Sequence, residues 1–84
     1  MDIQDIRHQK ASVIIGKNGL STGTIKLIQD LTKKNGMVKI KILKTALSPD
    51  YSKENLMEDL IAKTNLYKIE IRGFSAIVSK NPKN

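Results

Sequence analysis

The chain has 84 residues, with 15 lysines and arginines against 8 acidic residues, a formal net charge of +7 and an isoelectric point near 9.8. This length allows one domain and one thin hydrophobic core, which excludes a large enzyme fold with a roofed substrate cavity. With no cysteine and no apolar run long enough to cross a bilayer, disulfide frameworks, thiolate zinc sites and membrane spans are excluded, and we expect a soluble cytoplasmic protein.

The first half of the chain predicts a helix, a strand, a second helix and a second strand. Residues 2–10 can form a short helix, and the β-branched run over residues 12–15 predicts a short strand. Ser21 can cap a helix with apolar residues at three- and four-residue spacing, which Gly36 ends. Residues 37–43 alternate apolar side chains with lysines, which predicts a strand with one buried face and one wet face.

The second half predicts another helix followed by two strands. Ser52 can cap an amphipathic helix, residues 67–72 alternate as a second half-exposed strand, and a turn at Gly73 leads into a last strand over residues 76–78. The order (α)βαβαββ predicts an α/β fold of the α+β type, a two-layer sandwich with a mixed four-stranded sheet and helices mainly on one face. We expect a single domain over residues 1–80 and a flexible tail over residues 81–84.

Four residues between the first strand and the second helix form a candidate anion site, Gly16-Lys17-Asn18-Gly19. The N-terminus of a helix offers unpaired N–H groups and a partial positive charge. Glycines at both ends would allow left-handed backbone angles and close approach to a phosphodiester, with lysine and asparagine in between as donors. On these residues alone, a tight turn with no ligand explains the pattern equally well.

The charge is gathered in the middle of the chain. Residues 12–46 carry seven lysines and a single acid, Asp30, which favours a one-sided positive field that attracts polyanions. Lys39 and Lys41 are expected on the open face of the second strand, and Lys68 and Arg72 join them if the two strands are neighbours. Lysines in these positions can also be a solvated surface or protection against edge pairing.

Catalysis, metal binding and base-stacking platforms have little support. His8 has no partner at metal-ligand spacing, and no acid pair suggests general acid or base work, so we expect no enzyme activity and no cofactor. The three aromatic residues are too few for a stacking platform: Tyr67 is expected in the core and Phe74 as filler of a hairpin. Binding of a polyanion should then depend on its phosphates and on its shape.

Three segments taken together resemble a known family. They are IGKNGLS at residues 15–21, VKIKI at 38–42 and IRGFSAI at 71–77. In this order they resemble the CRM domain, the chloroplast RNA splicing and ribosome maturation module, which includes stand-alone YhbY-like proteins. The resemblance covers about residues 13–78. The chain departs from the family pattern in its short first helix and in a basic residue that precedes Gly73 instead of following it.

The resemblance implies a fold similar to the C-terminal domain of bacterial translation initiation factor three, a loop comparable to that of KH domains, and binding of structured RNA, above all ribosomal precursor RNA. The implied partners are this RNA and, with it, ribosomal proteins or a pre-ribosomal particle; we expect a monomer. The candidate RNA-binding residues are Gly16, Lys17, Asn18, Gly19, Lys26, Lys39, Lys41 and Arg72. Two alternatives stay open: a basic face that docks on acidic ribosome-assembly proteins, or a DNA-binding protein.

Overall fold

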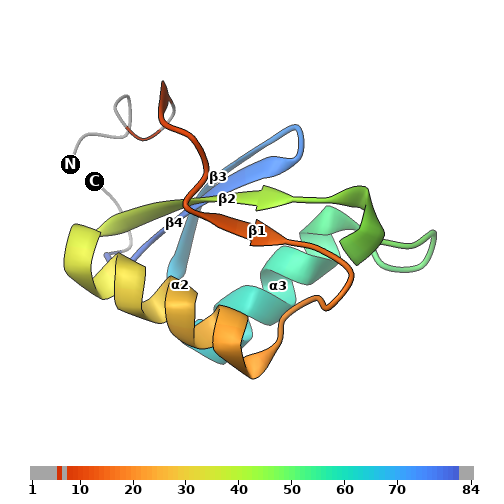
Figure 1. Ribbon diagram of the computed structural model, residues 1–84, viewed down its shortest axis with the longest axis horizontal. Helices are drawn as coiled ribbons and strands as arrows, with labels where there is room; N and C mark the ends of the chain where they lie inside the picture. The colour runs from red at the N-terminus through yellow and green to blue at the C-terminus, as the bar shows by residue number, and fades with distance from the viewer. Residues whose placement is uncertain (1–5, 7, 82–84) are drawn as a thin grey trace.

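The computed structural model describes residue 6 and residues 8–81, which form a mixed four-stranded sheet with two helices on one side (Figure 1). Most of the helix predicted over residues 2–10 lies outside the described residues, as does most of the predicted tail. The described elements are β1 (Val13–Ile15), α2 (Thr22–Asn35), β2 (Met37–Ile42), the 3₁₀ turn η1 (Lys44–Ala46), α3 (Lys53–Thr64), β3 (Tyr67–Arg72) and β4 (Ser75–Ser79). The predicted α+β architecture is confirmed.

Both helices begin where the sequence predicts, and α2 also ends where it predicts. The Ser21 hydroxyl accepts a hydrogen bond from the Thr24 N–H at 3.2 Å at the start of α2, and the Ser52 hydroxyl does the same for the Asn55 N–H at the start of α3. Gly36, with φ of 88°, ends α2, and a left-handed asparagine ends α3. Local capping chemistry therefore sets these boundaries.

The strands run in the order β1-β2-β4-β3, so the last strand of the chain lies inside the sheet and β3 lies at an edge. β1 pairs with β2 in parallel, and β4 pairs antiparallel with both β2 and β3. The parallel pair is joined through α2, because parallel neighbours need a long crossover connection. A register shift between Lys68 and Glu70 marks a bulge in β3.

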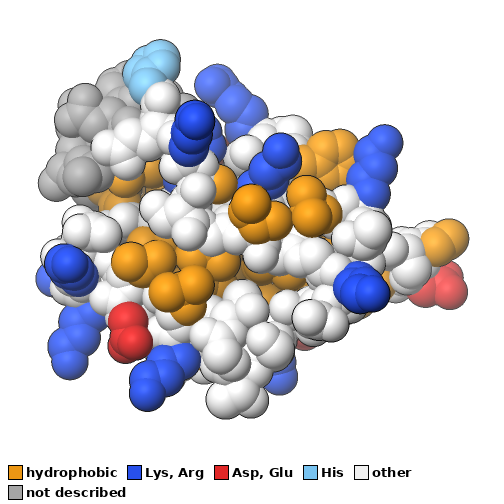
Figure 2. Space-filling model, in the orientation of Figure 1, with side chains coloured by type: hydrophobic (Ala, Val, Ile, Leu, Met, Phe, Trp, Pro, Cys, Tyr) orange, Lys and Arg blue, Asp and Glu red, His pale blue; other side chains and the backbone are white. Residues whose placement is uncertain are grey.

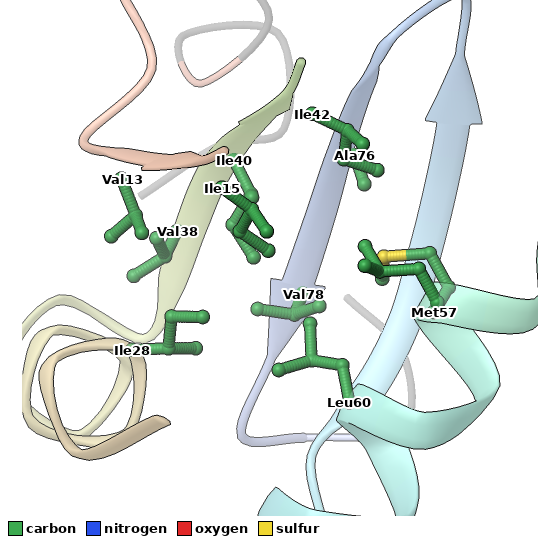
Figure 3. Close-up of a cluster of buried hydrophobic side chains, with 11 residues drawn as sticks. Val13, Ile15, Ile28, Val38, Ile40, Ile42, Met57, Leu60, Ala76 and Val78 are labelled. Carbon is green, nitrogen blue, oxygen red and sulfur yellow. The ribbon is translucent and has the colours of Figure 1, made fainter. Parts of the chain in front are cut away.

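The main core fills the space between the sheet and the two helices. Figure 3 shows the side chains of Ile28 from α2 and of Met57 and Leu60 from α3 directed toward the sheet. They meet the inward residues of the strands, which are Val13, Ile15, Val38, Ile40, Ile42, Ala76 and Val78. This face of the sheet is dry, as the alternation in residues 37–43 predicts.

The opposite face of the sheet is only partly wet, which corrects the expectation of one fully exposed face. Met37 and Ile77 are buried there with Ile6, and Ile69 packs against them. Ile6 thus covers part of this face. Among the described residues, no helix is both long enough and apolar enough to span a membrane.

Candidate nucleic-acid interface

The Gly16–Gly19 segment forms a tight turn between β1 and α2. The Gly19 N–H donates a hydrogen bond to the Gly16 carbonyl at 2.8 Å, and Gly19 has a φ of 60°, the left-handed region that favours glycine. Of the two glycines that would allow a left-handed angle, only Gly19 adopts one, because Gly16 has no positive φ. A Cβ at Gly16 would lie 3.5 Å from Leu43 Cδ1, an ordinary contact. Only Gly19 is therefore required by the backbone angle.

Lys17 and Asn18 occupy the two central positions of this turn, and both are exposed. The turn is followed directly by the capped N-terminus of α2, whose first N–H groups carry a partial positive charge. Lys26 is exposed in the second turn of α2. The arrangement offers an ammonium group, a carboxamide and a helix start within one short segment, which suits an anionic ligand.

Three segments far apart in the sequence meet where β1 and β2 end. The Leu43 N–H donates to the Ile15 carbonyl at 2.9 Å, and the Ile42 N–H donates to the Phe74 carbonyl at 2.7 Å. The glycine turn, the start of η1 and the β3–β4 hairpin therefore share one end of the sheet, which we call the loop end (Figure 1, right-hand side).

On the open face of the sheet, one row of paired residues runs across all four strands at the loop end. Its members are Ile14, Lys41, Ser75 and Arg72. Lys41 and Arg72 are exposed, and two inter-strand spacings, about 10 Å, separate their backbones. A shallow hollow of about 400 Å³ lies beside this row, lined by Lys10, Ala11, Ile14, Lys39, Lys41 and Ser75. The sheet thus brings together two cations that lie 31 residues apart in the sequence.

Lys39 differs from Lys41 although both belong to the same alternating run. It is half-buried, and its ammonium donates a hydrogen bond to the Gln9 carbonyl at 3.0 Å. Its row across the sheet continues through Ile77 to the acidic residue Glu70. Part of its charge therefore acts within the protein, in the contact between the N-terminal segment and the sheet.

Lys68 does not join the open face. β4 lies between β2 and β3, so the two strands that carry lysines and arginine are not neighbours. Lys68 pairs with Val78, whose side chain lies in the core on the helix side, and the bulge after Lys68 shifts the alternation. Lys68 lines an apolar hollow between α3 and β3 instead.

Two further lysines at the loop end, Lys44 and Lys53, are not among the site residues that the sequence predicts. The Lys44 and Lys53 ammonium groups lie 5.9 and 5.5 Å from the centre of the Phe74 ring, within the range of cation–π contacts. The Lys53 ammonium also donates to the Gly73 carbonyl. Lys44 belongs to the same lysine-rich stretch as Lys41, but no local pattern predicts that α3 begins beside the hairpin.

Basic side chains dominate the view of the molecule in Figure 2, where acidic side chains are sparse. Asp30, the one acid between residues 12 and 46, lies within α2. Among the described residues, no group of three or more histidines and acids could hold a metal ion. The loop end is therefore a cationic surface that is formed by the glycine turn, the start of α2 and the open face of the sheet.

Comparison with solved structures supports the same fold. A solution structure of a hypothetical Staphylococcus aureus protein, described as a candidate RNA-binding protein, superposes with a TM-score of 0.72 at 22% identity. The match covers 98% of this chain and 82% of the other. No match was found among curated proteins. The model of the CRS1/YhbY (CRM) domain matches residues 4–80, nearly the whole chain, and the chain therefore belongs to the CRS1/YhbY (CRM) domain family.

Proposed function

We propose that this protein is a non-enzymatic RNA-binding protein that recognises structured RNA, with ribosomal precursor RNA as its target. The observation that carries the proposal is the loop end: an exposed Lys17 and Asn18 on a glycine turn, on the same end of the sheet as Lys41 and Arg72. Family membership and the fold shared with a candidate RNA-binding protein support it.

The proposed contact residues divide by what they offer. Gly16 and Gly19 shape the turn, Lys17 and Asn18 present donors from it, and Lys26 extends the positive track along α2. Lys41 and Arg72 contact phosphates from the sheet, with Lys39 as a secondary contact because its ammonium already donates to Gln9. We propose that residues 1–80 act as one domain, as a monomer in the cytoplasm.

Phosphate neutralisation should dominate the affinity, because each lysine or arginine that meets a phosphate releases condensed counterions. With about six such contacts, the logarithm of affinity should fall with the logarithm of salt concentration at a slope of roughly −4 to −5. Filter binding or fluorescence anisotropy with a stable RNA stem-loop measures this slope. A slope near zero would overturn phosphate neutralisation as the basis of binding.

Lys17→Ala tests the turn itself, with Lys63→Ala as the control of equal charge change. Lys63 is exposed in the last turn of α3, about 15 Å along the helix from the loop end. Lys17→Ala should weaken binding to unrelated structured RNAs alike and make the salt slope shallower by about 1. Equal effects of the two substitutions would mean that only net charge matters.

The target is tested separately from the binding mode. Competition between structured RNA and duplex DNA of equal length distinguishes RNA from DNA, and a mobility shift with purified RNA distinguishes both from a protein-docking surface. Crosslinking in cell extract followed by sequencing of the attached RNA should enrich ribosomal precursor. Enrichment of other RNAs would keep the binding mode and reject this target.

A further inference from the structure

Phe74 lies at the tip of the β3–β4 hairpin with 45% of its surface exposed. The sequence suggested a hairpin filler, but the side chain is not covered by the core. Aromatic side chains, unlike exposed aliphatic ones, are enriched where proteins contact a partner. The groups around the ring indicate which part of a ligand it can contact.

The backbone of the tip is held in place, so the ring is presented from a defined position. Gly73 has a φ of 58°, and glycine at the first of two loop residues is typical of a tight type II′ hairpin turn. The Phe74 carbonyl accepts a hydrogen bond from the Ile42 N–H at 2.7 Å, which ties the tip to β2. Little conformational freedom would be lost when a ligand contacts this ring.

The ring is flanked by two ammonium groups. Lys44, exposed in η1, and Lys53, the first residue of α3, approach it from two different elements. The exposed part of the ring offers a π-surface for a base, and the two ammonium groups near it offer charges for the phosphates beside that base. Grooves that bind single-stranded nucleic acid combine these same two features.

The hairpin that carries the ring shares the loop end of the sheet with the glycine turn. The Phe74 carbonyl accepts a hydrogen bond from the Ile42 N–H in β2. β1, which leads into Gly16, lies on the other side of β2. Two inter-strand spacings, about 10 Å, separate the Phe74 backbone from that of Ile15, the residue that precedes the glycine turn. A strand of RNA held at the turn can therefore reach the ring within a few nucleotides.

We propose that Phe74 stacks on an unpaired base of the bound RNA, while Lys44 holds a phosphate next to that base and Lys53, whose ammonium already donates to the Gly73 carbonyl, adds a secondary contact. This inference rests on the proposed function and narrows its substrate class to structured RNA that carries a bulge or loop beside a helical stem. Stacking is tolerant of base identity, because every base has a π-face. Preference for unpaired nucleotides is thus expected without sequence specificity.

A tryptophan at position 74 makes the test direct, because the chain contains no tryptophan of its own. The probes are an RNA stem-loop with a bulge of unpaired nucleotides and a fully paired duplex of matched length. Phe74→Trp should lose fluorescence on binding the bulged RNA and change little with the duplex. Phe74→Ala and Phe74→Leu should both weaken binding to the bulged RNA about 5- to 100-fold, since leucine keeps apolar bulk without a π-face.

Tyr67 supplies the matched control. It is equally exposed at 45% and lies on the same strand as Arg72, but five residues away, roughly 16 Å from the hairpin end. Tyr67→Trp should show no quenching that depends on the bulge, and Tyr67→Ala should bind both RNAs like the parent protein.

Three outcomes would overturn the inference. In the first, Phe74→Ala weakens binding to the bulged RNA and to the duplex equally. In the second, Phe74→Leu binds the bulged RNA as tightly as the parent protein. In the third, the fluorescence of Tyr67→Trp is quenched as strongly as that of Phe74→Trp. If Lys17→Ala still weakens RNA binding, the proposed function survives this failure. If the parent protein binds neither RNA, both proposals fail together.

Discussion

The Leu43 N–H donates to the Ile15 carbonyl at 2.9 Å, at the end of β1 and immediately before the glycine turn. This bond continues the parallel pairing of β1 with β2 by one residue, so the turn and η1 leave the sheet side by side. The position of Lys17 relative to Lys44 is thus fixed by backbone pairing between residues that lie far apart in the sequence.

Gly19→Ala should destabilise the protein, whereas Gly16→Ala should be tolerated. The φ of 60° at Gly19 costs an alanine about 1 kcal/mol, while the added Cβ at Gly16 meets Leu43 at an ordinary distance. Urea unfolding of both variants measures the difference. Gly19→Asn should recover much of the loss, since asparagine adopts left-handed angles more readily; equal stability of the two alanine variants would contradict this account.

Lys41→Ala and Lys39→Ala should separate RNA binding from stability. Lys41 is exposed in the row with Arg72, so its loss should make the salt slope of RNA binding shallower by about 1. Lys39 donates to the Gln9 carbonyl, so its loss should mainly lower the thermal midpoint. Anisotropy titrations and thermal melts of both variants check this. The reverse pattern would place the phosphate contact at Lys39.

Ile28→Ala should cost roughly 2 to 5 kcal/mol of unfolding free energy, because it leaves a cavity between α2 and the sheet. Ile14→Ala is the control of the same chemical change, at a position that is 59% exposed on the open face. Denaturant unfolding should place the control close to the parent protein. A small loss at Ile28 would mean that α2 closes over the cavity.

Tyr51 should make stability fall at high pH. Burial and a hydrogen bond from its hydroxyl to the Asp59 carboxylate raise the pKa of Tyr51 from 10.0 to about 12. Between these values the folded state keeps a proton that the unfolded state has lost. The stabilising contribution is therefore complete below pH 10 and disappears as the pH rises toward 12.

Tyr51→Phe isolates this contribution from the titration of the lysines. The drop in thermal midpoint from pH 9 to pH 12 should be smaller in the variant than in the parent. The ultraviolet titration of the parent should also contain a tyrosinate step near pH 12 that the variant lacks. An identical pH profile in both proteins would show that the Asp59 contact does not hold the phenol proton.

The parts of the fold that depend on local chemistry could be predicted from the sequence. Ser21 and Ser52 cap their helices as expected, and the alternation in residues 37–43 assigns the buried face of β2 correctly. The turn at Gly16–Gly19 could also be placed, because a β-branched run and a capped helix bracket it. These features need only neighbours in the sequence.

The features that the sequence could not reveal depend on strand order. Tyr67 was expected in the core, but β3 is an edge strand and the side chain is exposed. Lys39 and Lys41 look alike in the alternation, yet the Lys39 ammonium donates to the Gln9 carbonyl while Lys41 is exposed. The ring of Phe74 meets Lys44 and Lys53 only because three non-adjacent segments converge. No local pattern encodes which strands become neighbours.

The strand order also has a consequence for synthesis of the protein. β4 is made after the other three strands of the sheet, yet it supplies the hydrogen-bonding partner for both β2 and β3. In a nascent chain that still lacks β4, β3 has no strand that connects it to β2. The sheet therefore closes in a late step, through contacts between residues that are distant in the sequence. The loop end is completed in that same step, and a partly synthesised chain does not yet present an assembled surface to the polyanions around it.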